Sequence, residues 1–122
     1  MTKHILLEGY YGAGNLGDEA ILQSVIELVQ QHYENCNIIV SSKRPRVTEN
    51  KYSSIDRSIT GFFQDKSKYV GTISDTDTVI IGGGGLLKSD AISYYAMVIL
   101  LSRLLNAKVY IFSVGVTPDF DT

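Results

Sequence analysis

Residues 9–22 read Gly-Tyr-Tyr-Gly-Ala-Gly-Asn-Leu-Gly-Asp-Glu-Ala-Ile-Leu, a glycine-rich stretch between two apolar segments. Ile5-Leu6-Leu7 precedes it as a short apolar run, and residues 20–33 follow it as an amphipathic run. This order predicts a strand, a glycine-rich turn and a helix. Glycine accepts a positive φ and lets a ligand approach the backbone closely. Because α/β proteins bind ligands beyond the carboxyl ends of their parallel strands, the stretch has the pattern of a binding loop.

The composition limits the class of protein. A chain of 122 residues with 44% hydrophobic and 20% charged residues suits one globular domain. The net charge of -2 gives no broad attraction to nucleic acid. The single cysteine, Cys36, permits no internal disulfide, which fits a reducing compartment. The most apolar stretch, residues 91–101, is shorter than the ~20 residues that span a bilayer. We expect a cytoplasmic protein, free or peripheral at the inner face of the membrane, with no transmembrane segment.

Apolar runs and turn residues predict the order of the elements. Strands are expected at residues 3–8, 38–40, 77–81 and 108–114. Helices are expected at residues 20–33, 62–73 and 91–105, the last of them closed by Asn106. The polar segment 41–60 contains Pro45 and is predicted to be a loop with at most one short extended piece near residues 53–59. Strands that alternate with helices predict an α/β fold with a Rossmann-like, doubly wound parallel sheet.

The first predicted helix has an apolar face. Spacing of three and four residues brings together Ala20, Ile21, Ser24, Val25, Leu28 and Val29. Two acidic residues, Asp18 and Glu19, lie in its first turn, where they complement the positive end of the helix dipole. We therefore expect this face to pack on the sheet.

Glycines follow three of the predicted strands, at Gly9, Gly82 and Gly115. The carboxyl ends of parallel strands share one edge of the sheet, and ligands bind in the crevice there. The sequence therefore predicts a functional cleft at this edge.

The first loop at this edge supplies most of the candidate site residues. Asp18 and Glu19 are candidates for base chemistry or for hydrogen bonds to sugar hydroxyls, with helix capping as the alternative. At most one of these two is expected to point into the cleft, because adjacent helical positions face different ways. Candidate substrate-binding residues in the same loop are Tyr10, Gly12, Gly14, Asn15 and Gly17. Tyr10 can stack on a sugar ring or pack at the rim, and Asn15 can be a plain N-cap.

The second loop follows the strand at residues 77–81. Four successive glycines cost more backbone entropy than a simple turn requires, and their N–H groups can form an anion-binding nest. The candidates here are Gly83, Gly84, Gly85, Lys88 and Asp90, the last also a possible helix cap. Neither loop has the sequence pattern of a P-loop. The sequence also shows no residues at the spacing of metal ligands and no Ser-His-Asp arrangement.

A dinucleotide site is an alternative, because Gly12, Gly14 and Gly17 match the pattern G-x-G-x-x-G. Two tyrosines separate this pattern from Gly9 at the strand end, and the carboxylates of Asp18 and Glu19 would repel a pyrophosphate. No acidic residue closes the second strand to hold a ribose. Instead the strand is followed by Ser41, Ser42, Lys43 and Arg44, which would suit the 2′-phosphate of NADP.

Three motifs together resemble the polysaccharide pyruvyl transferase family. They are residues 9–22, the segment Ile-Gly-Gly-Gly-Gly-Leu-Leu at 81–87, and the segment Ser-Val-Gly-Val-Thr-Pro at 113–118. They occur in the order in which the family has them, and they cover most of the chain. One position departs from the family pattern, because Thr117 stands where the third motif usually has a second glycine. This departure weakens the third motif as a site.

The resemblance implies a transferase that moves the enolpyruvyl group of phosphoenolpyruvate onto a saccharide, giving a pyruvate ketal and free phosphate. The bacterial members that this chain resembles modify polysaccharide of the cell wall. The family resembles two-domain glycosyltransferases of the GT-B type, so residues 1–122 would form a single α/β domain, the N-terminal half of a longer protein. The implied partners are a free or lipid-linked saccharide acceptor, phosphoenolpyruvate as donor substrate with no further cofactor, and a C-terminal domain. Two alternatives stay open, a non-catalytic saccharide- or nucleotide-binding module and an NADP-dependent oxidoreductase fragment.

Overall fold

A computed structural model describes residues 2–83 and 89–112, without the side chains of residues 89–91. Within this part of the chain, five strands and four helices alternate. The strands are β1 (Lys3–Glu8), β2 (Cys36–Ser41), β3 (Arg57–Ile59), β4 (Thr78–Gly82) and β5 (Lys108–Phe112). The helices are α1 (Leu16–His32), α2 (Pro45–Lys51), α3 (Lys66–Ser74) and α4 (Ser89–Leu104).

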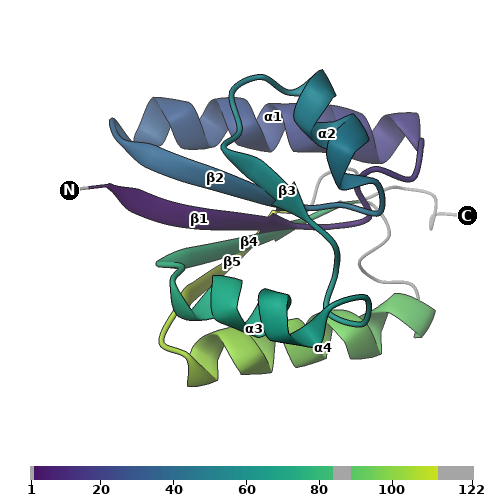
Figure 1. Cartoon of the computed structure of the whole chain (residues 1–122), viewed down its shortest axis with the longest axis vertical. Coiled ribbons are helices and arrows are strands. Elements are labelled where there is room, and N and C mark those ends of the chain that lie inside the picture. Colours follow the sequence, from purple (N-terminus) through teal and green to yellow (C-terminus); the bar gives the residue numbers. More distant parts are fainter. Residues whose placement is uncertain (1, 84–88, 113–122) are drawn as a thin grey trace, which may run out of the picture.

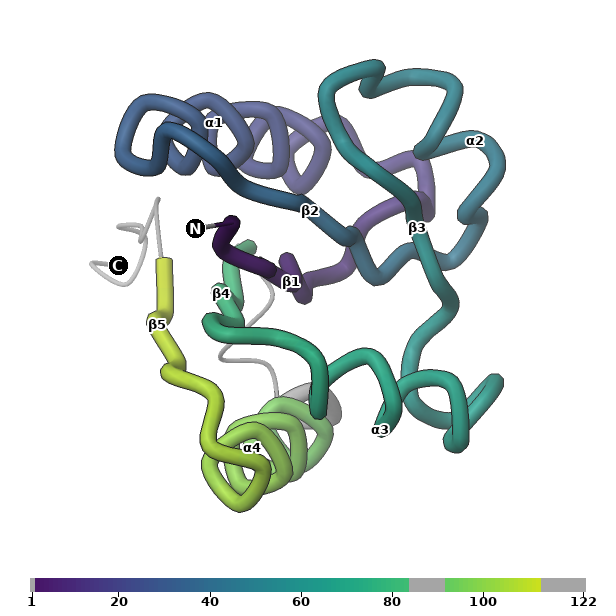
Figure 2. The backbone as a smooth tube through the Cα atoms, turned by 60° about the vertical axis from the view of Figure 1, so that its left-hand side comes forward, coloured from purple at the N-terminus to yellow at the C-terminus, as the bar shows by residue number. Residues whose placement is uncertain are grey.

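All the described strands belong to one parallel sheet, in the order β3-β2-β1-β4-β5. Helices α1 and α2 cover one face, and α3 and α4 cover the other (Figures 1 and 2). The order reverses at β1, because the chain moves outward first through β2 and β3 and then through β4 and β5. The predicted α/β, Rossmann-like doubly wound sheet is confirmed. In Figure 1 the strands run from left to right, so their carboxyl ends share the right-hand edge, which we call the carboxyl edge.

Strand β1 divides its side chains between two cores. Ile5 and Leu7 pack with the buried side of α1, whereas Leu6 packs with Tyr69 of α3 and its neighbours. This alternation is the ordinary period of a strand buried on both faces. It places the next residue, Glu8, on the same side as Leu6, where its carboxyl group accepts a hydrogen bond from Tyr69.

The buried face of α1 differs from the predicted one. The buried residues of this helix are Asp18, Glu19, Leu22, Val25, Ile26 and Val29. Of the predicted face only Val25 and Val29 are buried, and Leu28 is 52% exposed. The helix is turned so that its acidic first turn faces the glycine loop, and hydrogen bonds from Gly12 of that loop and from Tyr52 offset the burial of Glu19.

The prediction of a loop over residues 41–60 was wrong in its middle, because α2 forms there. Pro45 is the first residue of α2, a position where the fixed φ of proline suits a helix and its missing N–H costs nothing. The short extended piece is confirmed as β3. The second predicted helix begins later than expected, after Asp65, whose side chain caps α3 by accepting a hydrogen bond from the N–H of Lys68.

The remaining elements match their predictions to within a few residues. Asn106 ends the region of α4 with a φ of 67°, a left-handed conformation that asparagine tolerates. Residues 113 and 114 of the last predicted strand lie outside the described residues.

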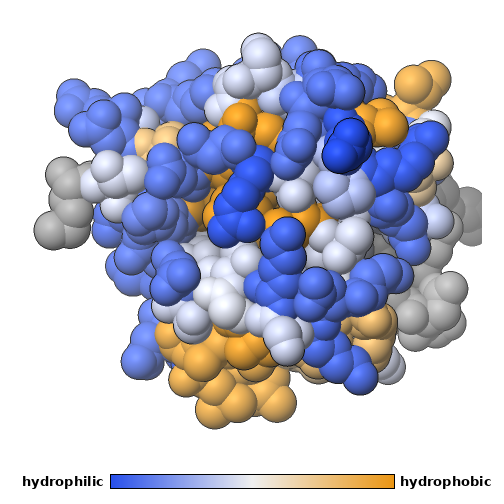
Figure 3. All heavy atoms as spheres, in the orientation of Figure 1, coloured by the Kyte–Doolittle hydropathy of each residue, from blue (hydrophilic) through white to orange (hydrophobic). Residues whose placement is uncertain are grey.

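Apolar residues gather along the lower edge of the surface in Figure 3, where Figure 1 places α4. Among the described residues, no helix combines the length and the apolar character that a membrane crossing requires.

Candidate functional site

The glycine loop after β1 is fixed by hydrogen bonds to the segment after β2. The N–H of Lys43 donates to the carbonyl of Tyr11 at 2.9 Å, and Nε of Arg44 donates to the carbonyl of Gly12 at 2.6 Å. Gly12 has a φ of 80°, and a Cβ atom there would lie 2.0 Å from Oγ of Ser42. The close contact of these two loops therefore requires glycine at position 12.

Glu19 holds the same loop from the side of α1. One carboxylate oxygen accepts the N–H of Gly12 at 2.7 Å, and the other accepts the hydroxyl of Tyr52 at 2.9 Å. Lys51 lies 3.6 Å from the second oxygen. Burial and the hydrogen bond to Glu19 raise the pKa of Tyr52, so this hydroxyl stays protonated. The contact with Gly12 occupies a backbone donor of the kind that a dinucleotide pyrophosphate would need.

Asn15 is the N-cap of α1. Its backbone is extended, and its side-chain oxygen accepts a hydrogen bond from the N–H of Asp18 at 3.1 Å. The capping alternative considered for Asn15 is therefore confirmed as a structural role.

We expect Asn15→Ala to lower the free energy of unfolding by about 1 kcal/mol, because the N–H of Asp18 loses its partner. Urea unfolding of the variant measures this loss. Gln30→Ala, at an exposed position of α1, is the matched control and should change the stability by no more than about 0.5 kcal/mol. Equal stabilities for the two variants would contradict the role of the cap.

Asp18 lies where the two predicted loops meet. Only 7% of this residue is exposed. A Cβ atom built on Gly83, which has a φ of 143°, would lie 3.2 Å from Oδ1 of Asp18. Both acidic residues are thus buried, and they face different partners, as expected for adjacent positions on a helix.

Two tyrosines of the first loop have different environments. Tyr11 is buried, and its hydroxyl donates to the carbonyl of Gly82 at 2.9 Å, which ties the loop to β4. Tyr10 is 48% exposed, and Nζ of Lys43 lies 5.1 Å from the centre of its ring. Tyr10 is therefore the aromatic side chain of this loop that a ligand can reach.

The other predicted site residues are glycines, which have no side chain to offer a ligand, or residues that lie wholly or partly outside the described part of the chain. Gly14 has a φ of 89°, and Gly17 is in the first turn of α1. Gly84, Gly85 and Lys88 fall outside the described residues. Asp90 lies in the first turn of α4, but its side chain falls outside the description.

The structure places a further carboxylate at the carboxyl edge, one that the sequence reasoning missed. Glu8, the last residue of β1, is only 2% exposed. One of its oxygens accepts hydrogen bonds from the hydroxyls of Tyr69 and, at 3.5 Å, Tyr94. Burial raises the pKa of Glu8 to about 7, although bonds from these tyrosines, from Ser41 and from the backbone of Gly9 oppose the increase. Glu8 can therefore exchange a proton near neutral pH.

A signal for Glu8 was present in the sequence. An acidic residue ends an otherwise apolar strand, directly before the glycine at the sheet edge. Strand alternation puts Glu8 on the side of Leu6, and the parallel register brings Ser41 of β2 beside it. What the sequence could not supply were the tyrosines, because Tyr69 and Tyr94 approach Glu8 from two separate helices.

Glu8 forms part of the wall of a hollow of about 340 Å³ at the carboxyl edge, which we call the Glu8 pocket. Residues that line it include Glu8, Tyr10, Ser41, Lys43, Phe63 and Tyr94. Its volume is within the range of small-molecule sites, about 300–1,000 Å³, and aromatic walls with a few polar groups are typical of such sites.

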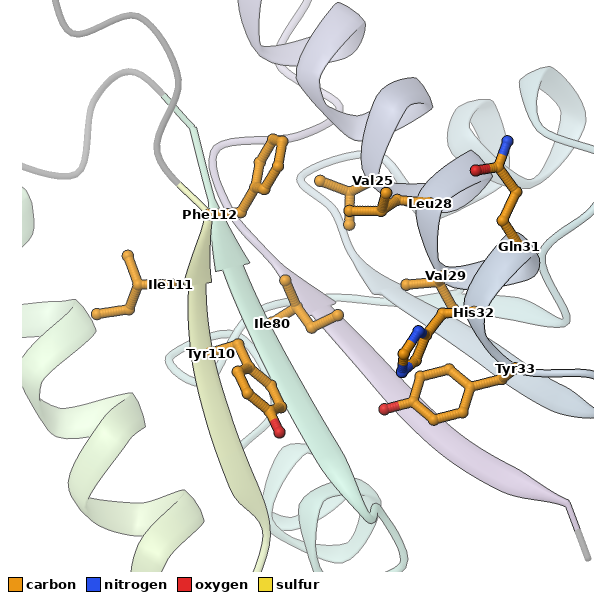
Figure 4. Close-up of a pocket in the computed structure, with 10 residues that line it drawn as sticks. All are labelled: Val25, Leu28, Val29, Gln31, His32, Tyr33, Ile80, Tyr110, Ile111 and Phe112. Carbon is orange, nitrogen blue, oxygen red and sulfur yellow. The ribbon is translucent and has the colours of Figure 1, made fainter.

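A second hollow, of about 520 Å³, lies between the later half of α1 and strands β4 and β5 (Figure 4). Its lining is mainly apolar and includes Val29, Ile80 and Phe112. It contains no carboxylate, lysine or arginine among the described residues that line it. The smaller Glu8 pocket is therefore the better candidate for chemistry.

Within the described part of the chain, no group of three or more histidine, cysteine or acidic side chains is placed to hold a metal ion.

A family model described as polysaccharide pyruvyl transferase matches residues 15–122. The match includes Asp18, the second glycine loop and the residues of α3 and α4 that face Glu8. A search of curated proteins and a search of solved structures each found no match.

Proposed function

Because the chain belongs to the polysaccharide pyruvyl transferase family, we propose that it transfers the enolpyruvyl group of phosphoenolpyruvate to a saccharide and forms a pyruvate ketal. Two hydroxyls of the acceptor form bonds to the central carbon of the enolpyruvyl group, and the bond from that carbon to the phosphate oxygen breaks. One hydroxyl proton ends on the methylene carbon, which becomes a methyl group, and the other leaves with phosphate. The chemistry therefore needs groups that accept hydroxyl protons.

The observation that carries this proposal is the gathering of buried carboxylates at the carboxyl edge. Glu8, Asp18 and Glu19 are each less than a tenth exposed there. Carboxylates accept hydrogen bonds from hydroxyls, so this edge suits a neutral, hydroxyl-rich acceptor better than the anionic donor. Glu19 is already bonded to Gly12 and Tyr52, which leaves Asp18 as the acidic residue of the first loop that we assign to an acceptor hydroxyl.

We assign the donor to a different surface. This chain would supply the acceptor side of a cleft, as the N-terminal half of a two-domain, GT-B-like protein, and cationic groups of the other half would hold the carboxylate and phosphate of phosphoenolpyruvate. Gly83, Gly84 and Gly85 would let the substrates lie against the backbone where the two sides meet. An acceptor on a lipid carrier would place the enzyme at the inner face of the cytoplasmic membrane.

We expect Asp18→Asn to lower turnover about 100-fold or more, because the amide keeps the size of the side chain but cannot take a hydroxyl proton. The measurement is phosphate release from phosphoenolpyruvate by the protein that carries this chain, with soluble disaccharide glycosides as acceptors. Glu27→Gln, on the exposed side of α1, is the matched control and should release phosphate at the rate of the unchanged protein. Normal turnover by Asp18→Asn would remove Asp18 from the site.

A further inference from the structure

The Glu8 pocket has a polar floor where strands β1 and β2 end and helix α4 lies against them. Glu8 of β1 and Ser41 of β2 lie side by side in the parallel register, and Tyr69 and Tyr94 donate to the Glu8 carboxylate from α3 and α4. The backbone that follows β3 passes over this floor. A Cβ atom on Gly61 would lie 3.1 Å from the hydroxyl of Tyr94, so glycine keeps this approach open.

The walls of the pocket are aromatic and accessible. Phe63 is 66% exposed, and its ring centre lies 5.7 Å from that of Tyr94. Tyr10 also lines the pocket, and Nζ of Lys43 lies 5.1 Å from the centre of its ring. Large aromatic side chains that stay this exposed leave apolar area unburied, which a ligand with an apolar face can cover.

A pyranose ring matches both parts of the pocket. Its C–H groups form apolar faces that stack on aromatic rings, and its hydroxyls project from the edge as hydrogen-bond donors. We propose that the Glu8 pocket binds a pyranose ring of the acceptor saccharide, with Phe63 and Tyr10 against the ring and with Glu8 as the acceptor of a proton from a reacting hydroxyl. The proton step rests on the function proposed above, whereas the saccharide site stands on the pocket alone.

In the step that closes the ketal, the O–H bond of this hydroxyl breaks and its oxygen bonds to the ketal carbon. The bond from that carbon to the phosphate oxygen breaks with its electron pair. The proton passes to Glu8 and then to the departing phosphate, so Glu8 ends each turnover as it began.

The groups around Glu8 favour this role at neutral pH. Tyr69 of α3, Tyr94 and Tyr95 of α4 and Tyr11 of the glycine loop all have raised pKa values, mainly because of burial and then because of the charge of Glu8. These hydroxyls stay protonated, and Asp18 adds a further negative charge that acts on Tyr11 and Tyr95. Glu8 itself, with a pKa of about 7, is the member of the group that gains and loses a proton under these conditions.

The saccharide site is tested by an NMR titration of the chain with a panel of methyl hexopyranosides. We expect shifts of the amide signals of Lys43, Phe63 and Gln64. Phe63→Ala should weaken the binding at least fivefold, whereas Tyr110→Ala, which removes an exposed aromatic ring from β5, should leave it unchanged. Signals that shift only around the hollow beside β5, or an equal loss in the two variants, would overturn the site.

The proton step is tested by Glu8→Gln in the protein that carries this chain. We expect the turnover number to fall by a factor of about 10² to 10⁴ with little change in KM. In a plot of the turnover number against pH, the decrease on the acidic side near pH 7 should disappear. Turnover and a pH profile like those of the unchanged protein would remove Glu8 from the reaction.

Saccharide binding at the pocket without phosphate release by any acceptor would refute the transferase proposal and the proton step but keep the site. Phosphate release with saccharide shifts elsewhere would keep the transferase proposal but refute the saccharide site and, with it, the proton step of Glu8.

Discussion

In the unchanged chain, the free energy of unfolding should decrease between pH 4.5 and about pH 8 because of Glu8. Glu8→Gln should abolish this decrease. The folded chain holds the Glu8 proton up to a pKa of about 7, whereas an ordinary glutamate loses it near 4.5. Between these values the folded state binds more protons than the unfolded state, so the free energy of unfolding falls as the pH rises. The contribution is fully present below pH 4.5 and is lost as the pH passes through about 7. At about 1.4 kcal/mol for each pKa unit, the loss is roughly 3 kcal/mol.

Urea unfolding at a series of pH values measures this effect as the difference between Glu8→Gln and the unchanged chain. Taking the difference cancels the titration of the other groups that the two proteins share. Glu34→Gln, which alters an exposed carboxylate after α1, is the matched control and should leave the profile of the unchanged chain intact. A difference that is constant from pH 4.5 to 8 would show that Glu8 ionises like an exposed glutamate.

Gly9→Ala should lower the free energy of unfolding by about 3 kcal/mol or more, a large part of the stability of a typical domain. A Cβ atom at this position would lie 2.2 Å from the carbonyl oxygen of Gly82 and 2.5 Å from Cζ of Tyr11. Neither neighbour can move freely, because the hydroxyl of Tyr11 is itself bonded to the carbonyl of Gly82 in β4. The glycine that follows β1 is thus required by packing, before any role in binding.

The matched control for this change is Gly71→Ala, in the middle of α3. Apart from its chain neighbours and the backbone of its own helix, a Cβ atom at Gly71 has nothing within 4 Å, and alanine is a better helix former than glycine by roughly 0.5–1 kcal/mol. The same substitution should therefore stabilise the chain at Gly71 and destabilise it at Gly9, as measured by thermal or urea unfolding. Similar stabilities for the two variants would contradict the close contact at Gly9.

The sheet could be predicted from the sequence because its central strands are buried on both faces. The runs around Leu6, Ile39 and Val79 are nearly continuous apolar segments, which are typical of parallel strands. The helix α2 could not be predicted in the same way, because it is short and polar and its start at Pro45 resembled a loop. The face of α1 was predicted wrongly because a count of apolar residues cannot show that Asp18 and Glu19 are buried against a loop.

The candidate site was located in the sequence but not completed there. The glycines after β1 and β4 indicated the carboxyl edge, and Asn15 showed the pattern of a helix cap. The Glu8 pocket is formed by residues that are as far as 86 positions apart in the chain, such as Glu8 and Tyr94. Contacts of this kind depend on the packing of two helices on one strand end, which no local pattern in the sequence records.

The most direct test of the central claim, that the carboxyl edge binds the saccharide acceptor, is an amide-resolved NMR titration of the chain with a soluble disaccharide glycoside. Parallel titrations with phosphoenolpyruvate and NADPH serve as comparisons. We predict that the disaccharide shifts signals of the glycine loop and of the Glu8 pocket, including Tyr10, Lys43 and Gln64, while NADPH shifts none of them. Shifts of the glycine loop by NADPH alone, with no response to the disaccharide, would contradict this account and favour a dinucleotide site.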